Sequence, residues 1–355
     1  MSQNFWKNKT VLVTGHTGFK GSWISMMLKK FGANVIGFSK DIPTKPSMYE
    51  IANVKHGMTS IIGNINDSKH INQVFAENKP EIVIHMAAQA IVRESYKNPL
   101  ETFSTNVIGT VNILDAVRNS DSVKIVIIVT SDKSYRTKTD NSKHSEDDPM
   151  GGYDPYSSSK GCAELVTSSY RSSFFNPSKF SEHKISIASV RAGNVIGGGD
   201  WGVDRLFPDI MRGIQNNSNI MIRNPESTRP WQFILDLLFG YILLAEKMWE
   251  DGKKFSQGWN FGPTNDDEKP VRWITEFIKN NTDKEINFEM DSSSQPYEEK
   301  YLRLDCTKAI SELGWKSKMN IEKTLMWTLK WYRAYNEGGN MKEFSEKQID
   351  EFITE

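Results

Sequence analysis

Short apolar runs alternate with longer amphipathic segments along the first half of the chain. The runs are rich in Val and Ile, as expected of strands in a parallel sheet whose two faces are both covered. We predict strands at residues 10–13, 35–38, 59–62, 81–85, 124–130 and 185–190, with helices at residues 67–78, 99–119 and 156–175. This alternation predicts an α/β fold built on a Rossmann-type, doubly wound parallel sheet.

The pattern changes after residue 192. Residues 193–229 are glycine-rich and then polar, residues 233–249 have the pattern of one helix, and loops alternate with helices further on. A chain of 355 residues is long for a single core. We therefore predict a dinucleotide-binding domain of residues 1–192, to which residues 230–256 return, and a smaller mixed α/β C-terminal lobe of residues 193–229 and 257–355 that binds the substrate.

A glycine-rich turn follows the first predicted strand. Gly15, Gly18 and Gly21 are spaced three residues apart, and an amphipathic helix begins near Trp23. In dinucleotide-binding folds the first glycine allows a tight turn, the second lets a pyrophosphate approach the backbone, and the third lets the helix pack on the strand. The helix N-terminus favours phosphate through its free N–H groups. A glycine turn without a ligand is the alternative, but the strand before it and the helix after it favour a dinucleotide site.

Charge and cysteine content narrow the class of protein. Lys and Arg number 44, as do Asp and Glu, so nothing predicts bulk attraction to nucleic acid or to an anionic membrane. The two cysteines, Cys162 and Cys306, are far apart and predict reduced thiols in the cytoplasm. Residues 1–9 do not resemble a signal peptide, and the apolar stretch 233–244 is too short to span a membrane.

Tyr156 and Lys160 are four residues apart on a predicted helix, which places both side chains on one face. The ammonium of Lys160 and the positive charge of an oxidised nicotinamide would lower the pKa of Tyr156 from about 10 toward neutrality. The phenolate could then accept the proton of a substrate hydroxyl while hydride leaves the same carbon. The alternative is a partly buried tyrosine and an exposed lysine on an ordinary helix, and the glycine turn upstream favours the catalytic interpretation.

The glycine spacing and the Tyr-x-x-x-Lys motif resemble the extended short-chain dehydrogenase/reductase family over nearly the whole chain. Further segments resemble its members that act on nucleotide sugars, and in particular the 4,6-dehydratases. These segments are residues 5–23, 85–89, 105–110, 150–164, 191–197, 198–201 and 229–233. The resemblance implies NAD as cofactor, CDP-glucose as substrate, deoxysugar synthesis for polysaccharides, and a homodimer that pairs the helices 99–119 and 156–175.

Ser131, Asp132 and Lys133 at the end of the fifth predicted strand decide between reactions. A 4-epimerase needs only transient oxidation at C4, whereas a 4,6-dehydratase must also remove the C5 proton and protonate the departing C6 hydroxyl. We predict Asp132 as that acid and Lys133 as the base at C5, where related dTDP-glucose enzymes usually carry a glutamate. The resemblance implies that Ser131 bonds the C4 oxygen.

The two roles make physical demands on this segment. Lys133 is a base only when neutral, so its pKa must be lowered. The cations that lower it also lower the pKa of Asp132, whereas an acid requires a raised pKa. Adjacent strand residues point to opposite faces, so the chain must leave strand geometry for both to face the sugar. The alternative for the pair is an exposed loop. For the whole chain, the alternatives are a 4-epimerase, a dehydratase of another nucleotide hexose and a non-catalytic dinucleotide-binding regulator.

The resemblance also implies which residues bind the dinucleotide and the nucleotide sugar. No metal ligand is predicted. The dinucleotide is expected to contact Gly15, Gly18, Phe19, Lys20, Gly21, Ser39, Asn64, Ile65, Ala87, Ala88, Gln89, Asn106, Thr130, Tyr156 and Lys160. The nucleotide sugar is expected to contact Arg93, Asn194, Arg205 and Arg229. One or two of Arg205, Arg212, Arg223 and Arg229 are expected to lie on the surface instead.

The second predicted strand ends without the usual signal for the choice between NAD and NADP. A carboxylate there would bind the ribose hydroxyls and exclude a 2′-phosphate. In this chain Ser39 and Lys40 come first and Asp41 follows them. These residues leave both dinucleotides open, and only the resemblance favours NAD.

Overall fold

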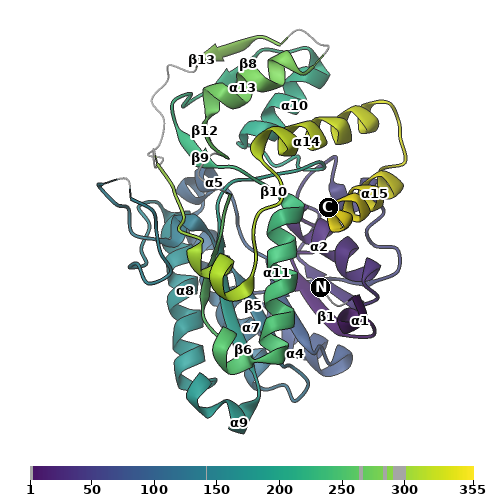
Figure 1. Ribbon diagram of the computed structural model, residues 1–355. Helices are drawn as coiled ribbons and strands as arrows, with labels where there is room; N and C mark the ends of the chain where they lie inside the picture. Colours follow the sequence, from purple (N-terminus) through teal and green to yellow (C-terminus); the bar gives the residue numbers. More distant parts are fainter. Residues whose placement is uncertain (1–2, 141, 264–266, 283–285, 291–300) are drawn as a thin grey trace.

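A parallel sheet of seven strands forms the centre of the computed structural model, which describes residues 3–140, 142–263, 267–282, 286–290 and 301–355. The strand order is β11-β6-β5-β4-β1-β2-β3, and each pair of neighbours runs parallel (Figure 1). The strands are β1 (Thr10–Thr14), β2 (Asn34–Ser39), β3 (Thr59–Ile62), β4 (Ile82–His85), β5 (Ile125–Val129), β6 (Ser186–Ala192) and β11 (Gly258–Phe261). The predicted doubly wound sheet is confirmed.

Both faces of the sheet are covered by helices, which is why its central strands β1, β4 and β5 are mostly apolar and buried. Alternate residues of β1 belong to different cores, since Leu12 packs in one hydrophobic cluster and Val11 and Val13 pack in the other. The first cluster includes residues of α4 (Ser68–Asn78) and α7 (Gly109–Arg118), and the second includes residues of α2 (Phe19–Lys30) and α11 (Ile234–Glu250). The helix α8 (Pro155–Ser173) packs beside α7.

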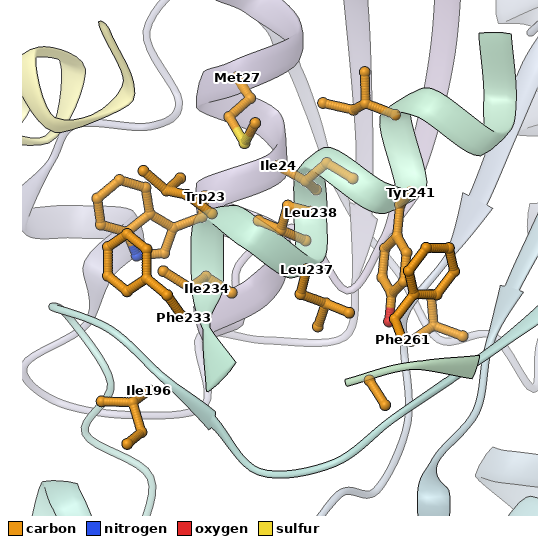
Figure 2. Packing of buried hydrophobic residues seen from close by; sticks show 14 of the residues in the cluster. Trp23, Ile24, Met27, Ile196, Phe233, Ile234, Leu237, Leu238, Tyr241 and Phe261 are labelled. Atoms are coloured by element: carbon orange, nitrogen blue, oxygen red, sulfur yellow. The ribbon is translucent and has the colours of Figure 1, made fainter. Parts of the chain in front are cut away.

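Helix α11 lies on the sheet next to α2, although more than two hundred residues separate them. Figure 2 shows Leu237 and Leu238 of α11 beside Ile24 and Met27 of α2, and all four side chains are fully buried. Trp23 also belongs to this cluster. The packing ties residues 234–250 to the dinucleotide-binding half of the chain.

The remaining elements form a second region, drawn in the upper part of Figure 1 around α10, α13, β8 and β13. It contains β7 (Val195–Ile196), α10 (Leu206–Asn216), β8 (Ile220–Ile222), β9 (Thr228–Pro230), β10 (Gln232–Phe233), β12 (Glu268–Pro270), α13 (Val271–Asn280) and β13 (Phe288–Met290). Three two-stranded sheets join β10 to β7, β12 to β9 and β13 to β8. Residues 264–266, 283–285 and 291–300 of the predicted lobe lie outside the described residues.

Further helices complete the chain. They are α1 (Gln3–Trp6), α3 (Met48–Ile51), α5 (Val92–Lys97), α6 (Pro99–Phe103), α9 (Phe180–His183), α12 (Gly252–Phe255), α14 (Ile321–Asn336) and α15 (Met341–Thr354). Short 3₁₀- or π-helical segments in the described residues are η1 (Ser104–Ile108), η2 (Asp132–Ser134), η3 (Pro177–Lys179) and η5 (Ala309–Leu313). No helix in the described part of the chain has the length and apolarity needed to cross a membrane.

Two expectations need correction. Residues 258–261 were assigned to the second lobe, but they form the outermost strand of the main sheet because their backbone pairs with β6. Residues 99–119 were expected to form one regular helix, but the π-helical turn η1 divides it into α6 and α7. This turn places Asn106, whose amide bonds the backbone of Gln89, at the sheet edge.

Candidate active site

A cleft of about 720 Å³ opens at the carboxyl ends of β1, β4, β5 and β6. The strand order reverses between β1 and β4, and ligands of doubly wound sheets bind at such a reversal. Every residue predicted to bind a ligand or to act in catalysis lines the cleft, with the exception of Asn106. Asn106 lies behind the residues that line the cleft. Its side-chain amide accepts the backbone N–H of Gln89 (2.8 Å) and donates to the backbone carbonyl of Gln89 (3.0 Å), which holds Gln89 in place.

The glycine turn is shaped by close packing of the backbone. Gly15 has φ +76°, and a Cβ there would lie 2.8 Å from the backbone nitrogen of Ala87. A Cβ on Gly21 would lie 2.0 Å from the carbonyl oxygen of Gly15. Gly18 is the N-cap of α2 and offers no side chain to the first turn of that helix. The turn therefore presents backbone N–H groups to the cleft, which fits a pyrophosphate group.

Lys20 brings a charged side chain into the same turn. It has no hydrogen bond or ion pair with a described residue. The pKa of Lys20 is lowered to about 8. Burial is the main cause and the charge of Arg205 adds to it, whereas Asp132 and Asp200 act to raise the pKa. An ammonium without a protein partner in a phosphate-binding turn fits an anionic ligand.

Ser39 lies where the adenosine ribose is predicted to bind, and its hydroxyl belongs to a polar network. It bonds Nδ1 of His16 at 2.8 Å, and Nε2 of His16 bonds the hydroxyl of Ser60 at 2.8 Å. Burial lowers the pKa of His16 to about 4, so the imidazole is neutral. The neighbouring Lys40 forms an exposed ion pair of 2.9 Å with Glu101. Both partners line the cleft, so Glu101 offsets the positive charge that Lys40 brings to it.

The segment after β5 leaves strand geometry, as the two predicted roles require. β5 ends at Val129, and residues 132–134 form the turn η2. Ser131 caps this turn, since its Oγ accepts the N–H of Lys133 at 3.2 Å and its O–H donates to Oδ1 of Asp132 at 3.0 Å. Asp132 and Lys133 consequently line the same cleft.

Asp132 is almost fully buried, with 3% of its surface exposed. Burial raises the pKa of its carboxyl, and this effect outweighs Lys133, Ser131, Arg229 and Lys20, which act to lower it. Its Oδ2 is buried and has no hydrogen-bond partner among the described residues. A carboxyl in the cleft whose pKa is raised by burial holds its proton to a higher pH than an ordinary aspartate, which suits a proton donor.

Tyr156 and Lys160 lie in the first two turns of α8, which Asp154 caps by accepting the N–H of Ser157 at 2.9 Å. Burial raises the pKa of Tyr156 to about 12, and the strongest opposing effects are a hydrogen bond with Ser131 and the charge of Arg205. Lys160 is not among the groups that shift this pKa, so the lowering that we expect from its ammonium is not found in the protein alone. Lys160 donates to the carbonyl of Val129 at 3.1 Å.

The opposite wall of the cleft carries arginine–aspartate pairs. Nη1 of Arg205 donates to both carboxylate oxygens of Asp200 (3.2 and 3.0 Å), and Arg223 bonds Asp204 at 3.0 Å. Arg93 reaches Asp204 across the cleft at 3.8 Å.

Arg229 is buried close enough to Asp132 to lower its pKa. Arg212 does not line the cleft itself; it bonds the carbonyls of Trp201 and Gly202 and the carboxylate of Asp209, which does line it.

Two acidic residues of the site were not predicted. Asp200 holds Arg205, and Glu164 lies behind Lys160 with bonds to Thr130, Ser189 and Arg191. Asp200 follows three glycines in an irregular segment, and no periodic signal marks it. Glu164 could have been found, because it is four residues beyond Lys160 and so shares its helix face.

Fold and cleft together define a dinucleotide-dependent enzyme of the extended short-chain dehydrogenase/reductase class. The chain belongs to the GDP-mannose 4,6 dehydratase family, whose model matches residues 12–328. It is 48% identical to the CDP-glucose 4,6-dehydratase of Salmonella typhimurium strain LT2 over 354 residues, which cover 100% of this chain and 99% of that protein.

Solved structures show the same fold. The dTDP-glucose 4,6-dehydratase of Bacillus anthracis in complex with NAD is 21% identical, with a TM-score of 0.76 over 93% of this chain and 98% of that one. The UDP-glucose 4-epimerase of Thermotoga maritima with UDP-glucose is 22% identical, with a TM-score of 0.76 over 92% of this chain and 99% of that one.

Proposed function

We propose that this protein is a lyase that converts CDP-D-glucose to CDP-4-dehydro-6-deoxy-D-glucose with NAD as a bound cofactor. The full-length similarity to a CDP-glucose 4,6-dehydratase gives the substrate and the product. The observation that carries the reaction type is the turn after β5, which brings Asp132 and Lys133 into the cleft with Tyr156 and Lys160. A 4-epimerase needs the second pair alone.

Each side chain has a role that its position supports. Tyr156 takes the proton of the C4 hydroxyl, and Ser131, which bonds both Tyr156 and Asp132, orients the C4 oxygen. The resulting C4 ketone makes the C5 proton acidic, and Lys133 removes it. Asp132 then protonates the C6 hydroxyl, which leaves as water. Burial raises the pKa of Asp132, which favours the protonated form that this step requires.

NAD fits the dinucleotide wall of the cleft. When bound, it would accept the hydride from C4 and supply it again at C6, while an acid of the site returns a proton to C5, so the chain needs no second redox partner. The uncapped first turn of α2 and the ammonium of Lys20 suit its pyrophosphate. Asp41 and Glu101 both line the adenosine end, and their carboxylates disfavour the 2′-phosphate of NADP.

The charged wall suits the diphosphate of the sugar nucleotide. Arg205 and Arg229 line it together with Asn194, and Arg93 faces it from across the cleft. The guanidinium of Arg205 keeps Nε and Nη2 for a ligand while Nη1 bonds Asp200. We therefore assign dinucleotide binding to the region of the main sheet, which includes residues 234–250. We assign binding of the nucleotide sugar to the second region.

The protein acts as a homodimer in this proposal. The exposed apolar residues of this face are Leu100 on α6, Ile108 on η1, Leu165 on α8 and Phe174 at the end of α8. On α8, Val166 and Tyr170 instead pack against the core of the sheet. A second copy of the chain would bury these exposed side chains. Light scattering at micromolar concentration should give twice the chain mass, and a monomer mass would exclude the dimer.

We place the reaction in the cytoplasm, because both Cys162 and Cys306 are free thiols. The product is an intermediate for deoxysugars of polysaccharides, as in the class of enzymes that the chain resembles.

Incubation with CDP-, dTDP-, UDP- and GDP-glucose tests the function. The proposal predicts a 4-keto-6-deoxy sugar from CDP-glucose, no net NADH, and little product from the other three. A C4 epimer as the product would make the chain an epimerase. A keto sugar from another nucleotide glucose would retain the reaction and change the substrate.

A further inference from the structure

Glu164 lies one helical turn beyond Lys160 on α8, buried between this helix and the strands β5 and β6. Its Oε1 accepts hydrogen bonds from the hydroxyl of Thr130 (2.5 Å) and from Nε of Arg191 (2.8 Å). Its Oε2 accepts the hydroxyl of Ser189 (2.6 Å) and Nη2 of Arg191 (2.9 Å). Four donors on one buried carboxylate favour its ionised form, and they lower the pKa of Glu164 in spite of burial.

Arg191 is itself fixed on its other side. Its Nη1 donates to the hydroxyl of Tyr135 at 2.6 Å and to the carbonyl of Glu146 at 2.9 Å. The guanidinium and the carboxylate of Glu164 thus form a buried, two-pronged ion pair whose outer bonds are satisfied. Such a pair holds Glu164 in one position.

Glu164 reaches the active site by two routes. Through its bond with Thr130 it holds the residue that precedes the catalytic turn Ser131–Ser134. Through its charge it acts on Lys160, since burial and the charge of Lys20 lower the pKa of Lys160 to about 8, while Glu164 acts to raise it.

The charged and titratable groups around Lys160 come from three elements. Lys20 faces it from α2, His85 from β4, and Tyr156 and Glu164 lie on its own helix. Burial lowers the pKa of His85 to about 3, so this imidazole is neutral. Tyr156, with its raised pKa, is neutral as well. Glu164 is therefore the anion that compensates the ammonium of Lys160 within the described part of the chain.

We propose that Glu164 is a positioning residue of this active site, which, clamped by Arg191, fixes Thr130 and keeps Lys160 charged one turn from Tyr156. The consequence for catalysis rests on the proposed function, because it needs Tyr156 and Lys160 to serve the C4 hydroxyl. The charge state of Lys160 can be measured without that function.

The test titrates the lysines of the full-length protein directly. Acylation with acetic anhydride at a series of pH values, followed by mass spectrometry of each lysine, gives the inflection at which each amine becomes neutral. In Glu164→Gln the inflection of Lys160 should fall by about one pH unit, because the opposite charge beside it is lost. Lys20 is the internal reference, since Glu164 is not among the groups that shift its pKa. An unchanged Lys160 inflection would overturn the proposal.

Matched variants separate charge from structure. Ser189→Ala removes one bond to the same carboxylate and keeps the charge, so the melting temperature should fall while the Lys160 inflection stays. Glu164→Asp keeps the charge and should restore most of the parent inflection. If Glu164→Gln leaves Arg191 unpaired and does not fold, Glu164→Gln with Arg191→Met removes both charges, and the Lys160 inflection should still fall.

The pH profile of kcat provides a second readout. In Glu164→Gln the decline of kcat that follows deprotonation of Lys160 should move to lower pH; this limb persists in Asp132→Asn, which distinguishes it from the limb set by Asp132. A merely structural clamp would lower kcat by the same factor at every pH. A parent protein that makes no keto sugar would refute the proposed function and leave the lysine titration to decide on Glu164. A parent that makes it, with Lys160 unshifted in the variants, would refute the role of Glu164 alone.

Discussion

The cleft has two walls that hold ligands by different physical means. The dinucleotide wall is built from the ends of strands, and its glycine turn offers backbone N–H groups, with Gly15 and Gly21 too closely packed to carry a side chain. The opposite wall is built from residues 193–231, where charged side chains such as Arg205 and Asp200 are paired at the surface of the cleft. The first wall selects its ligand by shape, and the second by charge.

The difference teaches where each kind of substitution should act. Adding a methyl group to the first wall displaces backbone atoms, whereas removing a charge from the second leaves the backbone in place. The floor between the walls, formed by Tyr156 and Asp132, serves both ligands. Changes there should have the largest effect on turnover.

Tyr156→Phe changes the floor of the cleft, which serves both ligands, and should have the largest effect. We expect kcat to fall by about 10²–10⁴-fold, because a positioned acid–base group is lost. The melting temperature should stay within about 4 °C of the parent, since one hydroxyl is removed from a site whose packing is retained. Steady-state kinetics with CDP-glucose, together with calorimetry, measures both. Activity within twofold of the parent would refute the role of Tyr156.

Asp132→Asn separates the two halves of the reaction. The amide cannot protonate the C6 hydroxyl, so product formation should fall by about 10²–10³-fold. Exchange of the C5 proton with heavy water should persist, because Tyr156 and Lys133 are unchanged. Loss of both product and exchange would place Asp132 in the oxidation step instead.

The pH dependence of the parent enzyme follows from the raised pKa of Asp132. The acid role needs the protonated carboxyl, which is present below the pKa and lost as the pH rises through it. kcat should therefore decline at a higher pH than an ordinary aspartate would permit, and Asp132→Asn should lack this limb. A pH–rate profile of both proteins is the measurement.

Gly21→Ala sharpens the comparison on the dinucleotide wall. The new Cβ would lie 2.0 Å from the carbonyl oxygen of Gly15, so the turn must shift. We expect NAD affinity to fall by about 10²-fold, since overpacking costs about 1–3 kcal/mol even where side chains can move. Affinity for CDP alone should change little. Equal losses for the two ligands, measured by calorimetry, would show that the walls are not independent.

Arg205→Met tests the charged wall of the cleft and should have the smallest effect of these substitutions. KM for CDP-glucose should rise by about 10-fold, because a hydrogen bond to a charged group contributes about 1.5–3 kcal/mol. NAD affinity should stay near that of the parent. Arg212→Met is the control from the same segment, since Arg212 does not line the cleft and bonds the backbone and Asp209, which Arg223 also contacts. It should lower the melting temperature and leave KM unchanged.

The two walls also differ in how far the sequence predicts them. The strands, the glycine turn and the pair Tyr156 and Lys160 follow from periodicity and spacing, which are local properties of the chain. On the charged wall, the helix α10 was missed although Phe207, Ile210, Met211 and Ile214 repeat at helical spacing. That signal was present and was obscured by the glycines and arginines around it.

Other features could not be predicted because they depend on distant contacts. The place of residues 258–261 in the main sheet depends on pairing with β6, which no local pattern encodes. The raised pKa of Asp132 depends on burial by the second region, and charge counting along the sequence suggested the opposite direction. The π-helical turn at Asn106 likewise depends on the neighbouring Gln89.

The path of the hydride tests the central claim most directly. CDP-glucose deuterated at C4 is converted in ordinary water, and the product is analysed by NMR. The account predicts deuterium at C6 and no free NADH, because Lys133 and Asp132 prepare C6 to receive the hydride taken from C4. Deuterium retained at C4, or one NADH released per sugar, would contradict the roles of residues 131–133.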